Sequence, residues 1–521
     1  MALAALACVV RLCIPLLRDD LVLDDHLLHL WWYLDVSDPG LFAGNYPFKY
    51  FSTGIYSPPL YHWIMTGLSG WLGPVPGAVL LAFALALVTG TLWWRLGTRL
   101  AGDSVGGFAA VFAWLALPSA LGFRLLDGLG RVDEGLPRSL MLPLLLAFLY
   151  FLIERRMVAL GFTILAAALC YPVVGLPMFV MLIMVFGHDA YLARRIPPGW
   201  YGLAILGVMS AAAFVVFNHR LPAEFGPTVD LATAKTMATF QAGGRSRFFE
   251  DSIYAQIVSN SRSGFGASIA DVVMVGLTLA AACWLRLRLH RFELKALLLS
   301  GVASWAVSYL LAFHLYLPGR HLHWLTNICA VLLVAVVVSH AARRLADRVP
   351  LQAWIVGALA WVAIAQGYSS VSTICRKVDE QHAAIMQDIV ALPRGAVVAA
   401  HPRDADPIPL LGRHPVPVSR EMFQPFHLGY FRRMEAEIAA LAVVLRAEQF
   451  DAAMAYGASH GVSYLLVDSR RAAKADRFLD HHFPDDGPAV ATRWYADVGQ
   501  SVPAERIVSR RGPWAIIDVR P

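Results

Sequence analysis

The sequence predicts a mainly α-helical, polytopic membrane protein of about eleven transmembrane helices, followed by a C-terminal soluble α/β domain. Of the 521 residues, 58% are hydrophobic and only 15% are charged, whereas a soluble protein carries about 25% charged residues. Long apolar runs recur along the chain, and short basic clusters separate them. From about residue 370 the pattern changes to short apolar stretches that alternate with amphipathic ones.

Each apolar run is a candidate membrane span. The runs begin near residues 1, 76, 104, 137, 158, 172, 201, 267, 296, 324 and 351, and each could form a helix that crosses the bilayer. Arg11 interrupts the first run. No basic segment precedes that run and no cleavage site of small residues follows it, so we expect a short first span rather than a signal peptide.

The loops between the spans alternate in charge. One set is short and basic, which is typical of cytoplasmic loops; its residues are Arg95, Arg99, Arg155, Arg156, Arg194, Arg195, Arg286, Arg288, Arg291, Lys295, Arg343, Arg344 and Arg348. The other set is longer, more aromatic and of mixed charge, and comprises the predicted outer loops 18–75, 121–136, 218–266 and 316–323. The pI near 9.0 therefore reflects topology, and nucleic-acid binding is not expected.

This alternation predicts a multi-pass protein of the cell inner (plasma) membrane with a cytoplasmic N-terminus. The transmembrane domain would span residues 1–368, and an extracytoplasmic (periplasmic) α/β domain would span residues 369–521. In the latter, residues 395–401, 462–468 and 514–519 have the pattern of buried strands. Residues 431–457 have a helical pattern, with Met434, Ile438, Leu441 and Leu445 on one face.

The first outer loop carries paired acids, Asp24 and Asp25, directly after the first span. If residues 24–35 form one helix, Asp25, His29 and Trp32 share a face. A carboxylate beside an imidazole can accept a proton from a sugar hydroxyl; with His26 or Asp24, the same carboxylate can hold a divalent cation. The alternative is an acidic pair that caps a juxtamembrane helix in solvent, and the residue pattern leaves both open.

Aromatic residues of the same loop are candidates for binding sugar. Tyr56, Tyr61 and His62 lie in an aromatic stretch that ends at Trp63. Such rings stack on sugar faces, although a belt at the membrane interface is the more common role for this residue type.

The later outer loops gather further charges. Arg131, Asp133 and Glu134 belong to a loop of three arginines and three acids; the arginines can bind phosphate, or the charges can simply pair. Arg320, His321 and His323 lie together between two spans, as in a phosphate clamp, although an interfacial anchor is the alternative. The loop 218–266 is cationic and glycine-containing, which suits either a mobile lid over an anionic lipid head group or a plain surface loop.

Together these features resemble the GT-C superfamily of membrane glycosyltransferases. The resemblance covers about residues 18–340 and rests on the layout of spans and on short motifs: Asp24-Asp25, Gly44-Asn-Tyr-Pro, Gly54-Ile-Tyr-Ser-Pro-Pro-Leu-Tyr, and Gly130-Arg-Val-Asp-Glu. The motifs look closest to uncharacterised bacterial membrane proteins described as related to 6-pyruvoyl-tetrahydropterin synthase. The chain departs from the superfamily in its short first span, and its C-terminal domain matches no known sugar-binding module.

The resemblance implies a glycosyltransferase that moves a hexose or pentose from a polyprenyl-phosphate donor to an acceptor, which is a lipid, a glycan or a protein, on the extracytoplasmic face. It implies Asp25 or Asp24 as the base, or as the group that orients the acceptor, and Arg320 or Arg131 as ligands of the lipid phosphate. A divalent cation is possible but not required. The rivals are a lipid or glycan transporter or flippase, which predicts inverted repeats and charges at mid-membrane, and a non-catalytic envelope assembly protein.

Overall fold

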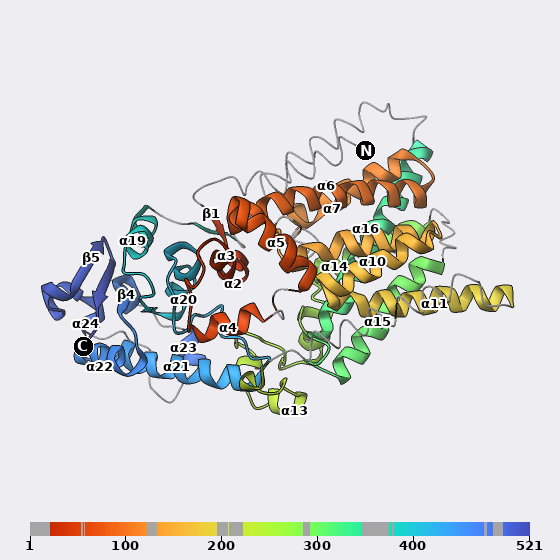
Figure 1. Ribbon diagram of the computed structural model, residues 1–521. Coiled ribbons are helices and arrows are strands. Elements are labelled where there is room, and N and C mark those ends of the chain that lie inside the picture. The colour runs from red at the N-terminus through yellow and green to blue at the C-terminus, as the bar shows by residue number, and fades with distance from the viewer. Residues whose placement is uncertain are drawn as a thin grey trace.

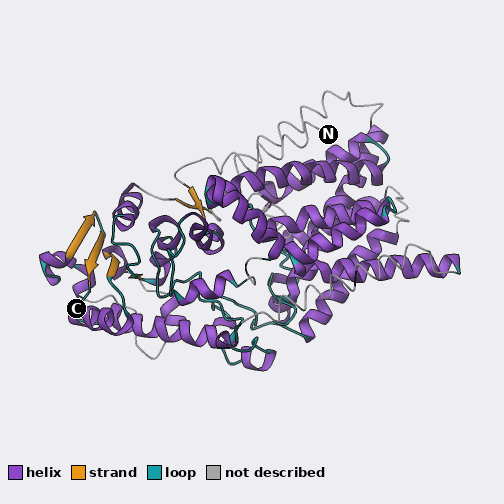
Figure 2. Cartoon of the chain, viewed as in Figure 1, coloured by secondary structure: helices purple, strands orange, loops and turns teal. Residues whose placement is uncertain are grey.

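A computed structural model describes residues 21–53, 56, 58–121, 132, 134–194, 207, 222–284, 292–345, 375–377, 380–473, 477–482 and 493–521. Long helices form one part of the molecule, and a smaller part that contains the C-terminal sheet lies at one end of them (Figure 1). Almost all of the described chain is helix or loop, and the four-stranded sheet lies at the end that holds the C-terminus (Figure 2). The mainly helical fold that the sequence predicts is confirmed.

Helices form at the predicted apolar runs that begin near residues 76, 104, 137, 158, 172, 267, 296 and 324. They are α6 (Pro74–Ala101), α7 (Ser104–Leu121), α9 (Met141–Ile153), α10 (Met157–Cys170), α11 (Gly175–Ala193), α14 (Ile269–Trp284), α15 (Phe292–Leu310) and α16 (Pro318–Leu345). Among the described residues, three helical segments are long and apolar enough to cross a membrane: Pro74–Ala101, Pro172–Ala193 and Pro318–Arg344. The runs near 1, 201 and 351 lie outside the described residues, so the count of eleven spans stays a prediction.

Two glycines let α6 and α7 pack backbone against backbone. A Cβ at Gly97 would lie 2.3 Å from the carbonyl oxygen of Gly106, and a Cβ at Gly106 would lie 2.2 Å from the Cβ of Ala101. Neither position tolerates a larger side chain. Close approach through small residues is how membrane helices associate when lipid surrounds them.

The basic loops meet at one end of the helices. Arg99 pairs with Glu154 at 2.6 Å, Arg155 with Asp189 at 3.1 Å, and Arg343 with Asp103 at 3.0 Å. The first outer loop and the C-terminal sheet lie at the opposite end (Figure 1). This grouping agrees with the predicted alternation of loops, while the side of the membrane on which each end lies stays a prediction.

The first outer loop folds into short elements rather than one helix. These are β1 (Leu21–Leu23), α2 (Asp24–His29), the 3-10 turn η2 (Trp31–Tyr33), α3 (Leu34–Ser37), α4 (Tyr46–Ser52) and α5 (Pro59–Leu72). The expected single helix over residues 24–35 is wrong, because the chain breaks at Leu30. Trp31, Trp32 and Tyr33 are all buried, and three successive side chains cannot share one face of an α-helix.

The segment 222–268 is not an unattached surface loop. It contains η6 (Ala223–Phe225), α13 (Leu231–Ala234), η7 (Ala238–Phe240) and the π-helix η8 (Ala255–Ser259). Its Val229, Phe240 and Phe248 are fully buried in a second hydrophobic cluster with Phe313. The backbone N–H of Val229 donates to the carbonyl of Phe426 at 3.0 Å, which ties the segment to the C-terminal part.

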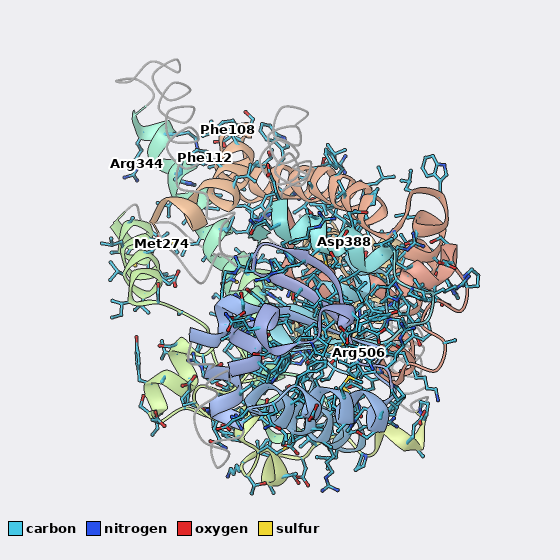
Figure 3. The ribbon with its side chains drawn as sticks, turned by 90° about the vertical axis from the view of Figure 1, so that its left-hand side faces the viewer. Phe108, Phe112, Met274, Arg344, Asp388 and Arg506 are labelled. Atoms are coloured by element: carbon cyan, nitrogen blue, oxygen red, sulfur yellow. The ribbon has the colours of Figure 1, made fainter. Side chains whose placement is uncertain are left out.

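The C-terminal part is a small α/β structure built on a sheet of order β3-β4-β6-β5. Its strands are β3 (Val398–Ala400), β4 (Tyr464–Asp468), β5 (Ile507–Arg511) and β6 (Trp514–Asp518), and its helices are α19 (Glu380–Val390), α20 (Pro402–Ala405), η9 (Ile408–Gly412), α21 (Leu428–Arg446), α22 (Asp451–His460), η10 (Ser469–Ala473), α23 (Arg477–His482), α24 (Arg493–Ala496), α25 (Val498–Ser501) and η12 (Ala504–Arg506). β3 and β4 are parallel, and the other pairs are antiparallel. When this end faces the viewer, Asp388 and Arg506 lie in front of the long helices (Figure 3).

Three strands form within the predicted stretches, whereas the edge strand β5, which is largely exposed, had no clear sequence pattern. The predicted helix 431–457 is two helices, α21 and α22, because the chain leaves the helix at Ala447. The break turns Phe450 into the core against Trp494, with ring centroids 5.9 Å apart. The predicted domain boundary at residues 368–369 lies outside the described residues. A two-stranded sheet nevertheless joins β1 to β2 (Cys375–Lys377), which links the first outer loop to the C-terminal part.

Candidate functional site

The predicted acid of the first outer loop meets an arginine that follows the second outer loop. Asp25 in α2 forms an ion pair with Arg138, which lies in the 3-10 turn η4 (Pro137–Leu140) at the start of α9. Arg138 also pairs with Glu134 on the same loop. His26 donates through Nε2 to the backbone carbonyl of Glu134 at 2.6 Å. Two loops that are more than 100 residues apart in sequence thereby form one site.

Glycine fixes the loop that carries Glu134. Gly135 has a φ of +62°, and a Cβ there would lie 1.9 Å from the carbonyl oxygen of Ala78 on α6. Only glycine fits such a close backbone contact at a positive φ. The hydroxyl of Tyr61 on α5 donates to the Gly135 carbonyl at 3.2 Å. The Glu134 carboxylate is therefore held on a rigid turn at the end of the helices.

His29 lies one helical turn after Asp25, between aromatic rings. Its ring centroid is 6.1 Å from that of Trp32 and 5.9 Å from that of Tyr56. Burial lowers the pKa of His29 to about 4, and burial lowers the pKa of His26 to about 4 as well. Both imidazoles are therefore neutral near pH 7. The Nδ1 of His29 is buried and has no hydrogen-bond partner among the described residues.

Four arginines gather here, and we call Arg138, Arg245, Arg262 and Arg320 the arginine cluster. Arg320 lies in the first turn of α16, with its guanidinium 5.7 Å from the ring centroid of Trp324. Its charge acts on both Arg138 and Arg262. Burial, together with the charges of Arg245 and Arg320, lowers the pKa of Arg262 to about 10. These guanidiniums are close enough to repel one another.

Two members of the cluster form no ion pair within the part of the chain that the structure describes. In the described part of the chain, no carboxylate forms an ion pair with Arg262 or Arg320, and the Nε of Arg320 is buried with no hydrogen-bond partner there. Buried guanidiniums normally pair with anions, because removing an unpaired charge from water is costly. Arg262 and Arg320 are partly buried, and two such cations close together are suited to an anion.

The C-terminal part contributes Glu421 to the site. Its carboxylate pairs with Arg245 at 2.6 Å, and both side chains are about nine-tenths buried. The charge of Glu421 also acts on His29, Arg138 and Arg262. Tyr171 interacts electrostatically with Arg138 and Arg320. Tyr316 interacts electrostatically with Arg138 and Arg262. Glu421, Tyr171 and Tyr316 are not among the site residues predicted from the sequence, because none of them lies in a recognisable motif.

The remaining predicted residues divide into three groups. Tyr56 and Tyr61 border the site, as described above. His321 and His323 hold backbone instead, since His321 Nε2 binds the carbonyl of Leu315 at 3.0 Å and His323 Nδ1 binds that of Phe265 at 2.8 Å. His62 is half-buried beside Tyr33. Outside the described residues lie Arg131, Asp133 and the side chain of Asp24.

Of the predicted ligands of a divalent cation, Asp25 and His26 have other partners, and the side chain of Asp24 lies outside the described residues. Asp25 pairs with a guanidinium, and His26 already donates to a backbone carbonyl. Across the described ranges, no group of three or more His, Cys, Asp or Glu side chains is arranged to hold a metal ion.

Comparison with known proteins supports the fold. No protein-family model and no curated protein sequence matches the chain. ArnT from Cupriavidus metallidurans, solved bound to undecaprenyl phosphate, is similar over 99% of this chain and 97% of its own, with a TM-score of 0.52 and 14% identity. The oligosaccharyltransferase of Archaeoglobus fulgidus, solved with zinc and sulfate, is similar over 90% of this chain and 68% of its own, with a TM-score of 0.50 and 15% identity. The chain therefore shares the overall fold of these two solved structures, which agrees with the fold that the resemblance to the GT-C superfamily implies.

Proposed function

We propose that this protein is a membrane glycosyltransferase that moves a sugar from a polyprenyl-phosphate donor to an acceptor hydroxyl on the extracytoplasmic face. The proposal rests on a contrast between acids and arginines within one site. Asp25 and Glu134 share Arg138, whereas Arg262 and Arg320 have no carboxylate partner in the described chain. One neighbour of this fold is an oligosaccharyltransferase by name, and ArnT, the other, is solved bound to undecaprenyl phosphate.

In the proposed reaction, Arg262 and Arg320 bind the phosphate of the donor. Asp25 accepts the proton of the acceptor hydroxyl as the oxygen forms its bond to the anomeric carbon. The bond from that carbon to the phosphate oxygen breaks, and the lipid phosphate leaves with the electron pair. The leaving group needs cationic stabilisation more than a proton, and the two arginines supply it. The transfer inverts the anomeric centre without a covalent intermediate.

The ion pair with Arg138 supports the role of Asp25 as an oriented carboxylate. A guanidinium holds a carboxylate in a fixed direction through planar hydrogen bonds. His29, neutral and buried one turn away, is placed to donate to or accept from a sugar hydroxyl. Tyr56, whose ring contacts His29, offers a face on which a sugar can stack.

A transporter or flippase is the rival that shares a lipid-phosphate site. It predicts charged residues in the middle of the membrane helices. Arg320 lies instead in the first turn of α16, and α2, which carries Asp25, lies at the same end of the helices as the C-terminal part (Figure 1). Charges gathered at one end favour chemistry at a surface over passage through the membrane.

The test is turnover by the full-length protein in lipid nanodiscs. Undecaprenyl-phosphate-linked hexoses and pentoses would be supplied with membrane extract as acceptor, and the release of undecaprenyl phosphate measured. We expect release with at least one donor, and loss of release in the Asp25→Asn variant. Movement of the intact lipid across sealed vesicles, unaffected by Asp25→Asn, would support the transporter instead.

A further inference from the structure

We propose that Glu421, supplied by the C-terminal part, is a positioning residue that sets the charge of the arginine cluster and so limits how tightly the cluster holds the lipid phosphate. The inference rests on the proposed function, because it concerns the same anion site. It gives the C-terminal part a defined role in the reaction, without requiring it to bind the acceptor.

Glu421 is held in place from several directions. Arg245 donates to its carboxylate at 2.6 Å, to its backbone carbonyl at 3.0 Å and to the carbonyl of Phe423 at 3.2 Å. The backbone N–H of Glu421 donates to the carboxylate of Asp406 at 2.8 Å. Arg245 belongs to the segment 222–268, so this contact joins that segment to the C-terminal part at the site.

The position of Glu421 lets its carboxylate offset part of the positive charge of the arginine cluster. Among the described residues of the site, the four guanidiniums of the arginine cluster face the carboxylates of Asp25, Glu134 and Glu421. Arg420 also pairs with Glu421, at 3.4 Å, so among the described residues these arginines outnumber the three acids by two. Without Glu421 the excess would rise to three, and Arg245 would join Arg262 and Arg320 in facing the lipid phosphate.

Tighter binding of the lipid phosphate would not by itself make the enzyme turn over faster. The arginines must stabilise the phosphate as it leaves, but the product carries the same phosphate and must then depart. Binding that is equally strong for donor and product lowers KM without raising kcat, and slow product release limits turnover in many enzymes. We infer that Glu421 keeps the cluster cationic enough to bind the donor and weak enough to release the product.

The experiment measures the Kd of undecaprenyl phosphate for the full chain in nanodiscs, together with kcat and KM where turnover is found. For Glu421→Gln we expect a Kd about threefold to tenfold lower than that of the wild type, the size expected for one charge at this range, with KM and kcat both reduced. Raising the salt concentration should shrink the difference. The Arg245→Gln, Glu421→Gln double variant removes one charge of each sign, and we expect its Kd to return to within about twofold of the wild type.

Two controls separate charge from structure. Glu421→Asp keeps the charge and should leave the Kd near the wild-type value, whereas a purely structural role would move it. Asp388 on α19 pairs with Arg511 on β5 at 2.7 Å, in the C-terminal part. Asp388→Asn removes this carboxylate, and we expect no change in the Kd of undecaprenyl phosphate. Asp388 and Arg511 belong to none of the contacts that form the site.

The outcomes are distinguishable. If wild-type protein binds undecaprenyl phosphate and Arg320→Gln weakens the binding, but Glu421→Gln fails to tighten it or the double variant fails to restore it, the inference about Glu421 is overturned while the proposed function stands. If the wild type does not bind undecaprenyl phosphate at all, the proposed function fails, and the inference falls with it.

Discussion

Helix α16 carries an arginine near each end, and the two have opposite surroundings. Arg343, near the C-terminal end, is 48% exposed, pairs with Asp103 at 3.0 Å and donates to the carbonyl of Ala101 at 2.7 Å. Arg320, at the N-terminal end, has a buried Nε with no partner in the described chain and lies beside two other arginines. The helix thus carries Arg343, which has an ion-pair partner, and Arg320, which has none in the described chain.

This difference separates arginines that pair with acids from arginines that are candidates for binding an anion. Arg343, Arg99 and Arg155 all have acidic partners at the basic end of the helices and are at least one-third exposed. Such pairs orient loops and contribute little free energy. Buried arginines that face one another instead of acids are costly for the free protein, and that cost is recovered only when an anion binds.

The largest contrast is expected between the acids of the two ends. Asp25→Asn should lower kcat/KM about 10²-fold to 10⁴-fold, because the proposed base is lost. Asp103→Asn should leave kcat/KM unchanged and should reduce stability by less than about 1 kcal/mol, because the amide oxygen of Asn can still accept from the N–H of Gly106, as Asp103 does at 2.8 Å. Steady-state kinetics and thermal unfolding check both. Equal activity of the two variants would contradict the assignment of Asp25.

Arg138 should matter for stability as well as for activity. Arg138→Gln removes the guanidinium shared by Asp25 and Glu134, and the Glu134 side chain is only 1% exposed. We expect the free energy of unfolding to fall by about 3 kcal/mol. Arg155→Gln, at the more exposed opposite end, should cost less than about 1 kcal/mol. Denaturation followed by tryptophan fluorescence measures both, and similar losses would remove the distinction between the ends.

Acid should weaken the site end through its buried histidines. Burial lowers the pKa of His26 and His29 from 6.5 to about 4 in the folded protein, so the unfolded chain takes up protons first as the pH falls. The contribution of each neutral histidine to the free energy of unfolding is complete above about pH 6.5 and declines between pH 6.5 and 4. Below about pH 4 this contribution, up to about 3 kcal/mol for each histidine, is lost. His26→Gln should flatten this decline in a series of unfolding measurements. A decline that His26→Gln leaves unchanged would show that His26 titrates normally.

The smallest effect is expected at an exposed pair of the basic end. Arg99 is 50% exposed where it meets Glu154, so Arg99→Gln should change the free energy of unfolding by less than about 1 kcal/mol and leave turnover unaltered. A large loss in either measurement would show that the basic end has a role beyond topology.

The sequence supported the prediction of fold more readily than that of the site. Apolar runs mark membrane helices directly, because hydrocarbon accepts little else. The site joins residues from distant loops, and no local pattern shows that Arg138 reaches Asp25 or that Glu421 reaches Arg245. His321 and His323 illustrate the converse, since their spacing suggested ligands while tertiary packing assigns them to backbone carbonyls.

The most direct test of the central claim is the Kd of undecaprenyl phosphate for two variants of one helix. Arg320→Gln should raise the Kd about tenfold or more, because a buried charge-assisted contact to phosphate is lost. Arg343→Gln, in the last turns of α16, should leave the Kd at the wild-type value. If both variants bind as the wild type does, or if Arg343→Gln weakens binding as much as Arg320→Gln, the arginine cluster is not the phosphate site and the account is wrong.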